Sequence, residues 1–349
     1  MPFHAPASCP QAGRNRRGHP PCTAYRARND MPRRRAFLLA GGALAAPGVA
    51  RAAWPLDRPI EIIVPAPAAS AHDAIARLVA QHLPRQIPGA RCVATNRPGA
   101  GGQIGFEALF HAPADGYTLG MVTATPLHAM AIERRPRYDP EGFTFLANIV
   151  DDPGGFWVKA NSPWTSLADL QMAARGAPGE IGIGTTGIGS DDHLLVLGFE
   201  SAAEITLLHV PYASTGPIQR DLLVGTLAVG AFNASEALPL LRGRRIRGLA
   251  QAGPERWPAA GTLPTFREGG FDVTGGAARG IAAPPGLPAE ITLQFELALK
   301  DMLADPGFLQ EAEAQMLPLR PLVGLPYRRR MAADHAALQA LWQRRPWRD

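Results

Sequence analysis

The sequence has little cysteine and, after its first 52 residues, no long hydrophobic run. Cys9 and Cys22 lie within those first residues, so Cys92 alone remains and an intrachain disulfide is excluded in the rest of the chain. Cys92 sits in a strand-like segment without a partnered base, and we expect a buried, inert thiol. No stretch of about 18 uncharged apolar residues follows the first 52, so no membrane span is expected there.

Several catalytic signatures are missing as well. We find no H-E-x-x-H metal site, no G-x-S-x-G nucleophile elbow, and no Ser/His/Asp or Cys/His set at readable spacing. The glycine-rich segment 96–102 lacks the G-K-[ST] ending of a phosphate-binding loop, which leaves a tight turn or a ligand contact as its role. We therefore expect no enzyme, no catalytic residue, no cofactor and no metal.

The first 52 residues have the features of an export signal. An R-R-x-F-L string at 34–38 precedes a short apolar run and an A-x-A site at 50–52. This order predicts cleavage near Ala52 and a periplasmic protein, and the paired arginines indicate the twin-arginine route. A short membrane anchor is the alternative, but the run is short and glycine-rich. We expect translation to start at Met31, because a leader that begins there has normal length.

The charge of the chain divides at the same boundary. The whole sequence of 349 residues carries a net charge of +5, but its first 52 residues hold nine arginines and one aspartate. The remainder has 26 basic and 29 acidic residues, a net charge of −3. The basic character belongs to the leader, and nothing in the remainder supports binding to nucleic acid.

Strand and helix patterns alternate from residue 60 onward, which predicts an α/β fold with mainly parallel sheets flanked by helices. The helix at 74–83 is expected to begin at Asp73 as its N-cap. The expected strands are 60–64, 91–95, 117–123, 155–158, 180–184, 207–210, 227–232, 246–251 and 280–283. The other expected helices are 102–110, 166–175, 190–201, 217–224, 289–303 and 327–342.

The elements fall into two similar halves, which suggests a hinged two-lobe clamshell with a ligand in the cleft. We expect lobe 1 to comprise residues 53–152 and 276–349, the latter with the C-terminal helices, and lobe 2 to comprise residues 153–275.

Residues 182–187 spell G-x-G-x-x-G between a strand and a helix. One interpretation is a dinucleotide fingerprint, but no acidic strand-end residue follows about 20 positions on. Another is an anion-binding loop at a helix N-terminus, where Thr185, Thr186 and Ser190 add hydroxyl donors. A plain turn is the third. The adjacent Asp191-Asp192-His193 is either a metal-ligand group or a helix start whose carboxylates complement the helix dipole.

The chain from about Trp54 to Trp342 resembles the tripartite tricarboxylate transporter substrate-binding family, also called the Bug family. Each matching string is weak by itself, and together, in order, they are specific. They are PIEIIVP at 59–65, NRPGAGGQIG at 96–105, ADGYTL at 114–119, YDP at 138–140, HVPY at 209–212, DLLVGTL at 221–227, LPTF at 263–266 and APPGLP at 283–288.

The resemblance implies a periplasmic-binding-protein fold of type II that closes on a small carboxylate. It implies membrane permease subunits as partners, and we expect a monomer with a small organic acid as ligand. A sensor-linked or orphan binder of the same fold is the first alternative, and a dinucleotide-dependent enzyme is a remote one.

The resemblance also suggests ligand-binding residues. The family's glycine-rich first loop corresponds to Pro65–Asp73, where alanine and serine replace the glycines and narrow the approach of the backbone. The expected ligand set from all these arguments is Ser70, Asp73, Thr125, Thr185, Thr186, Gly189, Ser190, His193, Asn233 and Arg279.

Arg279 stands where the family often has an aromatic residue. We hypothesise that its guanidinium forks onto a second carboxylate and selects a diacid or triacid over a monoacid, whereas a surface or interlobe arginine is the alternative.

Overall fold

The computed structural model describes residues 54–347, which belong to one compact unit built on a sheet of ten strands. The predicted leader, its cleavage site and the start at Met31 lie outside the described residues. The strands are β1 (Ile60–Val64), β2 (Cys92–Asn96), β3 (Thr118–Thr123), β4 (Thr144–Lys159), β5 (Gly182–Thr185), β6 (Leu208–Pro211), β7 (Val229–Asn233), β8 (Ile246–Gln251), β9 (Gly276–Ala283) and β10 (Leu319–Val323).

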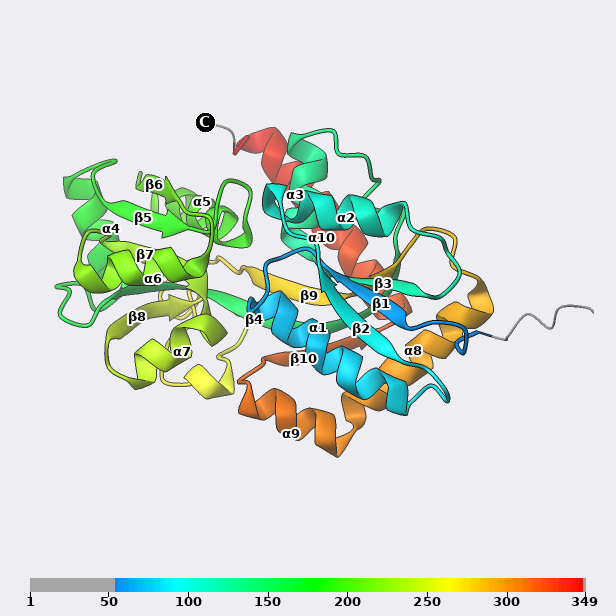
Figure 1. The fold of residues 1–349 in the computed structure, drawn as a ribbon. Helices are drawn as coiled ribbons and strands as arrows, with labels where there is room; N and C mark the ends of the chain where they lie inside the picture. Colours follow the sequence, from blue (N-terminus) through cyan, green and yellow to red (C-terminus); the bar gives the residue numbers. More distant parts are fainter. Residues whose placement is uncertain (1–53, 348–349) are drawn as a thin grey trace, which may run out of the picture. The chain divides into compact units, whose positions relative to one another are not determined.

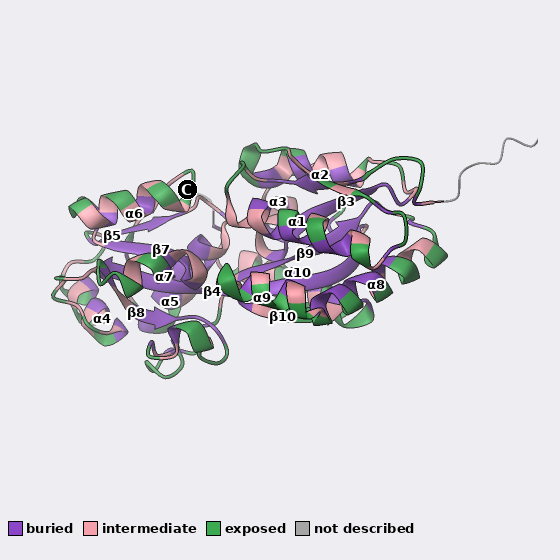
Figure 2. Cartoon of the chain, turned by 60° about the horizontal axis from the view of Figure 1, so that its bottom comes forward, coloured by how far each residue is buried: buried purple, intermediate pink, exposed green. Residues whose placement is uncertain are grey.

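Helices cover both faces of this sheet, and their outer sides are exposed while the central strands are buried (Figure 2). Among the described residues no helix combines the length and the apolar character that crossing a membrane requires. The helices are α1 (Ala71–His82), α2 (Gln103–Phe110), α3 (Ala124–Glu133), α4 (Leu167–Gly176), α5 (Asp191–Ala203), α6 (Thr215–Val224), α7 (Ala234–Arg242), α8 (Ala289–Ala304), α9 (Pro306–Ala314) and α10 (Leu325–Arg344). Short 3-10 turns are η1 (Leu83–Arg85), η2 (Ala100–Gly102) and η3 (Pro258–Ala260).

Strand β4 is shared by two groups of strands (Figure 1). Its first part pairs with β9 and β10, and its last residues pair with β7 and β8. We call the group of β1, β2, β3, β9 and β10 with the first part of β4 and the flanking helices lobe 1. The group of β5 to β8 with the end of β4 and its helices is lobe 2. Every antiparallel pair includes β4 or β9, and the outer pairs are parallel.

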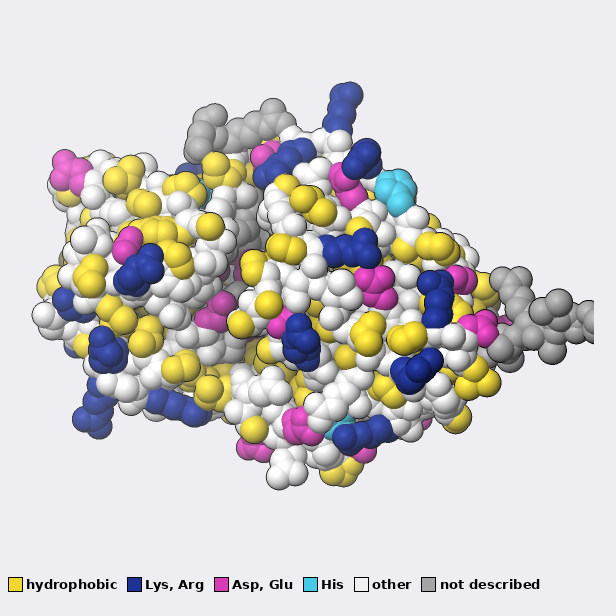
Figure 3. Space-filling model, viewed as in Figure 1, with side chains coloured by type: hydrophobic (Ala, Val, Ile, Leu, Met, Phe, Trp, Pro, Cys, Tyr) yellow, Lys and Arg dark blue, Asp and Glu magenta, His cyan; other side chains and the backbone are white. Residues whose placement is uncertain are grey.

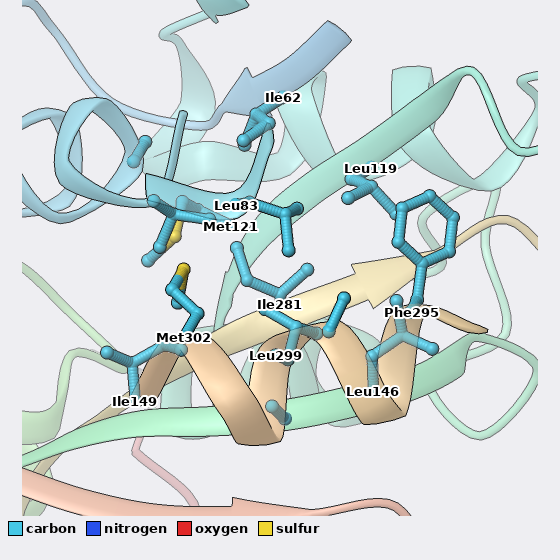
Figure 4. Close-up of a cluster of buried hydrophobic side chains, with 14 of the residues drawn as sticks. Ile62, Leu83, Leu119, Met121, Leu146, Ile149, Ile281, Phe295, Leu299 and Met302 are labelled. Carbon is cyan, nitrogen blue, oxygen red and sulfur yellow. The ribbon is translucent and has the colours of Figure 1, made fainter. Parts of the chain in front are cut away.

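Each lobe has its own apolar core. In lobe 1, the residues Leu119, Met121, Ile149 and Ile281 of the sheet pack against α8, which contributes Phe295, Leu299 and Met302 (Figure 4). In lobe 2, Phe156 is fully buried and packs edge to face against Phe199 of α5 and Phe266. Between the lobes, Leu194 and Leu197 of α5 meet Ala129 of α3 and Trp347. Burial at about 25 cal/mol per Å² of apolar area makes these cores the main stabilising term.

The predicted α/β class with helices on the sheet faces is confirmed, and the parallel pairing expected between the outer strands is present. The N-cap of α1 was predicted wrongly: Ser70 holds that position and accepts a hydrogen bond from the backbone N–H of Asp73. The first part of β4 escaped prediction, because its continuous apolar run has no clear period. Cys92 is half-buried, and burial raises the pKa of its thiol to about 12.

Gly276 starts β9 where the chain returns to lobe 1, and its φ of +147° is in the region that side chains rarely adopt. A Cβ there would overlap the carbonyl oxygen of Asp152 and the backbone nitrogen of Gly154. Gly276→Ala is therefore expected to lower the free energy of unfolding by about 1–3 kcal/mol, measured by urea denaturation. Gly216→Ala is the control, because nothing lies within 4 Å of its added Cβ. An unchanged urea midpoint for Gly276→Ala would contradict the close packing described here.

Candidate functional site

Three helices begin directly after strands near the place where β4 and β9 run between the lobes. Helix α3 follows β3 at Thr123, α7 follows β7 at Asn233, and α5 begins at Asp191 after the loop that leaves β5. Arg279 of β9 pairs in register with Thr123 of β3, so the arginine is at the same edge as the start of α3. Such strand ends are where ligands bind in open α/β sheets.

A buried ion pair occupies the centre of this site. Arg279 NH1 lies 3.0 Å from Asp152 Oδ2, and the two residues are only 4 % and 1 % exposed. The Asp152 carboxylate also accepts a hydrogen bond from the backbone N–H of Ser235 at 3.1 Å and a short one from the Ser235 hydroxyl. One carboxylate of β4 thereby joins β9 of lobe 1 to the first turn of α7 in lobe 2.

Three further carboxylates lie close to this ion pair, each held by one polar neighbour. Asn233 Nδ2 donates to Asp191 Oδ2 at 3.2 Å, the Thr186 hydroxyl donates to Asp192 Oδ2 at 2.5 Å, and the Thr215 hydroxyl donates to Glu236 Oε1 at 3.0 Å. We call Asp152, Asp191, Asp192 and Glu236 the acidic cluster.

Burial is the main influence on the pKa values of Asp191, Asp192 and Glu236. Desolvation raises the pKa of Glu236 to about 7 and that of Asp191 above its usual value, although Arg279 opposes both shifts. Burial and then the neighbouring Asp191 raise the pKa of Asp192 well above its ordinary range. Burial would lower the pKa of Arg279, but the nearby carboxylates outweigh it and raise that pKa. Arg279 is thus charged, while Asp191, Asp192 and Glu236 bind protons more readily than exposed acids do.

Three buried atoms at the site have no hydrogen-bond partner in the part of the chain that the structure describes. They are Asp192 Oδ1, Asn233 Oδ1 and Arg279 Nε. Asp192 is 2 % exposed and Asn233 is 4 % exposed, so neither oxygen faces open solvent. Buried polar atoms without partners are uncommon in native proteins, and two acceptors and one donor at one place mark a site for a bound molecule.

The first loop holds two of the predicted ligand residues. Ser70 caps α1, and the Asp73 carboxylate is surrounded by donors: the Ala69 N–H, Asn96 Nδ2 and the Arg77 guanidinium. The hydrogen bond from Arg77 is the main reason why the pKa of Asp73 falls to about 2. Asp73 organises the loop, and its neighbour His72 is the residue that reaches the site, sharing a 2.5 Å hydrogen bond with Thr123.

The second loop has most of its polar groups in use within the chain. Thr185 bonds to His209 at 2.7 Å, Thr186 donates to Asp192, and Ser190 caps α5 by accepting from the N–H of His193. His193 Nδ1 accepts from the Gly189 N–H, and its ring stacks on that of His209 with centroids 4.0 Å apart. Burial is the main cause that lowers the pKa of His193 to about 3, so this ring is neutral at pH 7.

A cavity of about 1180 Å³ reaches the acidic cluster from one side. Thr125, Asp152 and Asp191 line it, together with residues of α5, of α10 and of the segments 252–258 and 272–278. The site residues Arg279, Asp192, Asn233, Glu236 and His72 are not part of its lining. In the view of Figure 3 the surface is hollowed between the lobes, and acidic side chains lie at the hollow.

The structure brings Thr186, Asn233 and Arg279 of the predicted set to this site, with Thr125 at the cavity. Sequence reasoning missed Asp152, Glu236 and His72, because a single acid or histidine after a strand has no pattern of its own. One pattern could have indicated such residues: a polar residue recurs in the first turn of the helix that follows a strand.

The structure also bears on two alternative interpretations of the second loop. Asp191, Asp192 and His193 turn to three different partners, and no group of three or more metal-ligating side chains occurs among residues 54–347. Glu200, a carboxylate close to the position expected for a ribose-binding acid, is buried at the far end of α5. It accepts from the Leu207 N–H and pairs with Arg345 at 2.6 Å.

Comparison with known proteins agrees with this architecture. Residues 75–318 match the model of the tripartite tricarboxylate transporter family receptor. A protein from the tcbD-tcbE intergenic region of Pseudomonas sp. is 30% identical over 283 residues, covering 78% of this chain and 83% of that protein. A solute-binding protein from Polaromonas is 26% identical with a TM-score of 0.71 and covers 84% of this chain and 100% of its own. An R. palustris protein solved with adipate is 30% identical with a TM-score of 0.73 and covers 84% and 97%.

The fold therefore defines the class of two-lobe α/β solute-binding proteins. Within that class, the chain belongs to the tripartite tricarboxylate transporter receptor family, which confirms the predicted family.

The buried acids predict a stability that depends on pH. The pKa of Glu236 is about 7 in the folded chain and near 4.5 when unfolded. Its contribution to stability is full below 4.5 and is lost as the pH rises through 7. Glu236→Gln stays neutral, so its melting temperature should exceed that of the wild type by about 2–4 °C at about pH 8 and equal it at about pH 4.

Glu313→Gln, an exposed position on α9, is the control and is expected to change neither value. A Glu236→Gln protein that gains as much at low pH as at high pH would contradict the assigned protonation.

Proposed function

We propose that this chain is an exported solute-binding protein that captures a small organic carboxylate between its lobes and delivers it to the membrane subunits of a tripartite tricarboxylate-type transporter. We take residues 53–152 with 276–349 as one lobe and residues 153–275 as the other. The hinge is the place where the chain passes between the lobes, in β4 and at the start of β9. We place the protein in the periplasm, with its leader removed after Ala52. The membership of its family supports the transporter, and the adipate in a 30% identical neighbour supports the carboxylate.

The observation that carries the proposal is Arg279. It is buried, it stays charged, and its Nε has no partner among the described residues. A guanidinium N–H aimed away from its ion pair is a strong donor for a carboxylate, worth about 1.5–3 kcal/mol in a charge-assisted hydrogen bond. The sequence suggested that the whole Arg279 guanidinium could bind a second carboxylate. Because Arg279 Nη1 pairs with Asp152, only the other N–H groups of the guanidinium remain for a ligand.

Binding is tested by thermal shift with a panel of small monoacids, diacids and amino acids on the full chain. A ligand at a hundredfold excess over its Kd stabilises the folded state by about 2.7 kcal/mol, which is a readily measured shift. Removing Arg279 alone would strand the buried Asp152 charge, so the informative variant is the pair Asp152→Asn/Arg279→Gln. It should lose at least about tenfold in affinity for the best carboxylate.

Asp152→Asn alone keeps the arginine and should retain binding. Arg329→Gln, at an exposed position, controls for the general effect of replacing an arginine by glutamine. Equal affinity in the paired variant and in Asp152→Asn would remove the assigned role of Arg279. If no small carboxylate shifts the melting temperature, the proposal fails. Delivery is tested separately, by uptake of the identified solute into cells with and without this chain.

A further inference from the structure

The charges at the site are not balanced in the way that a binding site for a dianion requires. Arg279 already forms its ion pair with Asp152, and within residues 54–347 no ion pair to Asp191, Asp192 or Glu236 accompanies it. The carboxylates are close enough to act on one another: Asp191 raises the pKa of both Asp192 and Glu236. An additional anion in this place would further oppose the ionisation of these acids, which burial already disfavours, so they would have to stay protonated beside it.

Two of the three helix N-termini at the site, those of α5 and α7, are also occupied by the chain itself, whereas α3 has no acidic residue in its first turn. Asp191 and Asp192 fill the first turn of α5, and Glu236 fills the first turn of α7. These carboxylates already take the positions where a helix dipole favours negative charge. The hydroxyl of Thr186, expected from the sequence to donate to a ligand, donates to Asp192 instead.

The atoms without partners indicate what is missing. Asp192 Oδ1 and Asn233 Oδ1 are potential acceptors that have no hydrogen-bond partner among the described residues, and both residues are more than nine-tenths buried at this site. Asn233 is placed in it by its own Nδ2, which donates to Asp191. An ammonium group has three donors and no acceptor, so it matches two acceptors beside an excess of carboxylates.

We propose that the ligand is an amino carboxylate with no net negative charge, whose ammonium group binds Asp191, Asp192 and Asn233 and whose carboxylate binds Arg279. This inference rests on the proposed function, which supplies the carboxylate, and it narrows the substrate class. A bare metal ion is a poorer match, because no group of three metal-ligating side chains occurs in the described chain.

Proton release accompanies this binding. Glu236 faces Arg279 and Asp152 at the crossing, Asp191 and Asp192 of α5, and Thr215 of α6. A positive charge placed among these groups stabilises their ionised forms, so uptake of the ammonium expels protons held by the ligand-free cluster. The enthalpy of binding is therefore expected to vary with the ionisation enthalpy of the buffer.

The test is isothermal titration calorimetry on the full chain with probes of matched length. One set is adipate, 6-aminohexanoate and hexanoate, and a shorter set is succinate, 4-aminobutanoate and butanoate. In at least one set the amino acid is expected to bind at least about tenfold more tightly than both the diacid and the monoacid. Asp192→Asn should remove that preference, while Asp301→Asn, an exposed position on α8, should leave it unchanged. Glu236→Gln is the second variant, in case Asp192→Asn does not fold.

The outcomes separate this inference from the proposed function. A diacid that binds more tightly than the amino acid of its set overturns the inference and leaves carboxylate capture intact. Equal binding of amino acid and monoacid, with no effect of Asp192→Asn or Glu236→Gln, overturns it as well. If no probe binds at millimolar concentration while the wider carboxylate panel does, the inference also fails. If nothing in either panel binds, both the inference and the proposed function fail.

Discussion

The ion pair between Arg279 and Asp152 is the interaction on which the rest of the site depends. Taking both charges out of water is costly, and their attraction repays that cost only when other groups satisfy the remaining lone pairs. Ser235 does so for Asp152 with its N–H and its hydroxyl. The three residues come from β4, β9 and α7. The contacts that neutralise the Asp152 carboxylate therefore also hold the start of α7, a lobe 2 helix, against the strands of lobe 1.

The surrounding chemistry follows from how little positive charge is present. Within residues 54–347, Arg279 is the cation that acts on Asp191 and on Glu236, and in both cases burial outweighs it and raises the pKa. The adjacent polar groups, Thr186, Thr215 and Asn233, each satisfy one oxygen of one carboxylate. The result is a site that is prepared on one side with acceptors and on the other with a single strong donor.

Periodicity and turn chemistry predicted much of the fold, whereas the candidate site residues came mainly from the resemblance and stay predictions. Strands 60–64 and 246–251 agree with β1 and β8 at both ends, because glycine, proline and charged residues bound their apolar runs. Asn233 and Arg279 were found from the resemblance, and both reach the site. Asp73 and His193 were placed in the ligand set as well, but one is surrounded by donors of its own loop and the other is stacked on His209. Which partner a polar side chain selects depends on the tertiary approach of distant segments, and local sequence does not encode it.

Strand β4 has a mechanical consequence for the molecule as a whole. Its sixteen residues run without interruption from the sheet of one lobe into the sheet of the other. If one lobe unfolded, the part of β4 that pairs in that lobe would lose its hydrogen-bonded neighbours. The unpaired backbone would then adjoin the central strand of the lobe that stays folded. The lobes have separate cores, but they share β4, so we expect neither lobe to unfold without the other. Heating should therefore give one calorimetric peak, with its measured enthalpy equal to the van't Hoff value.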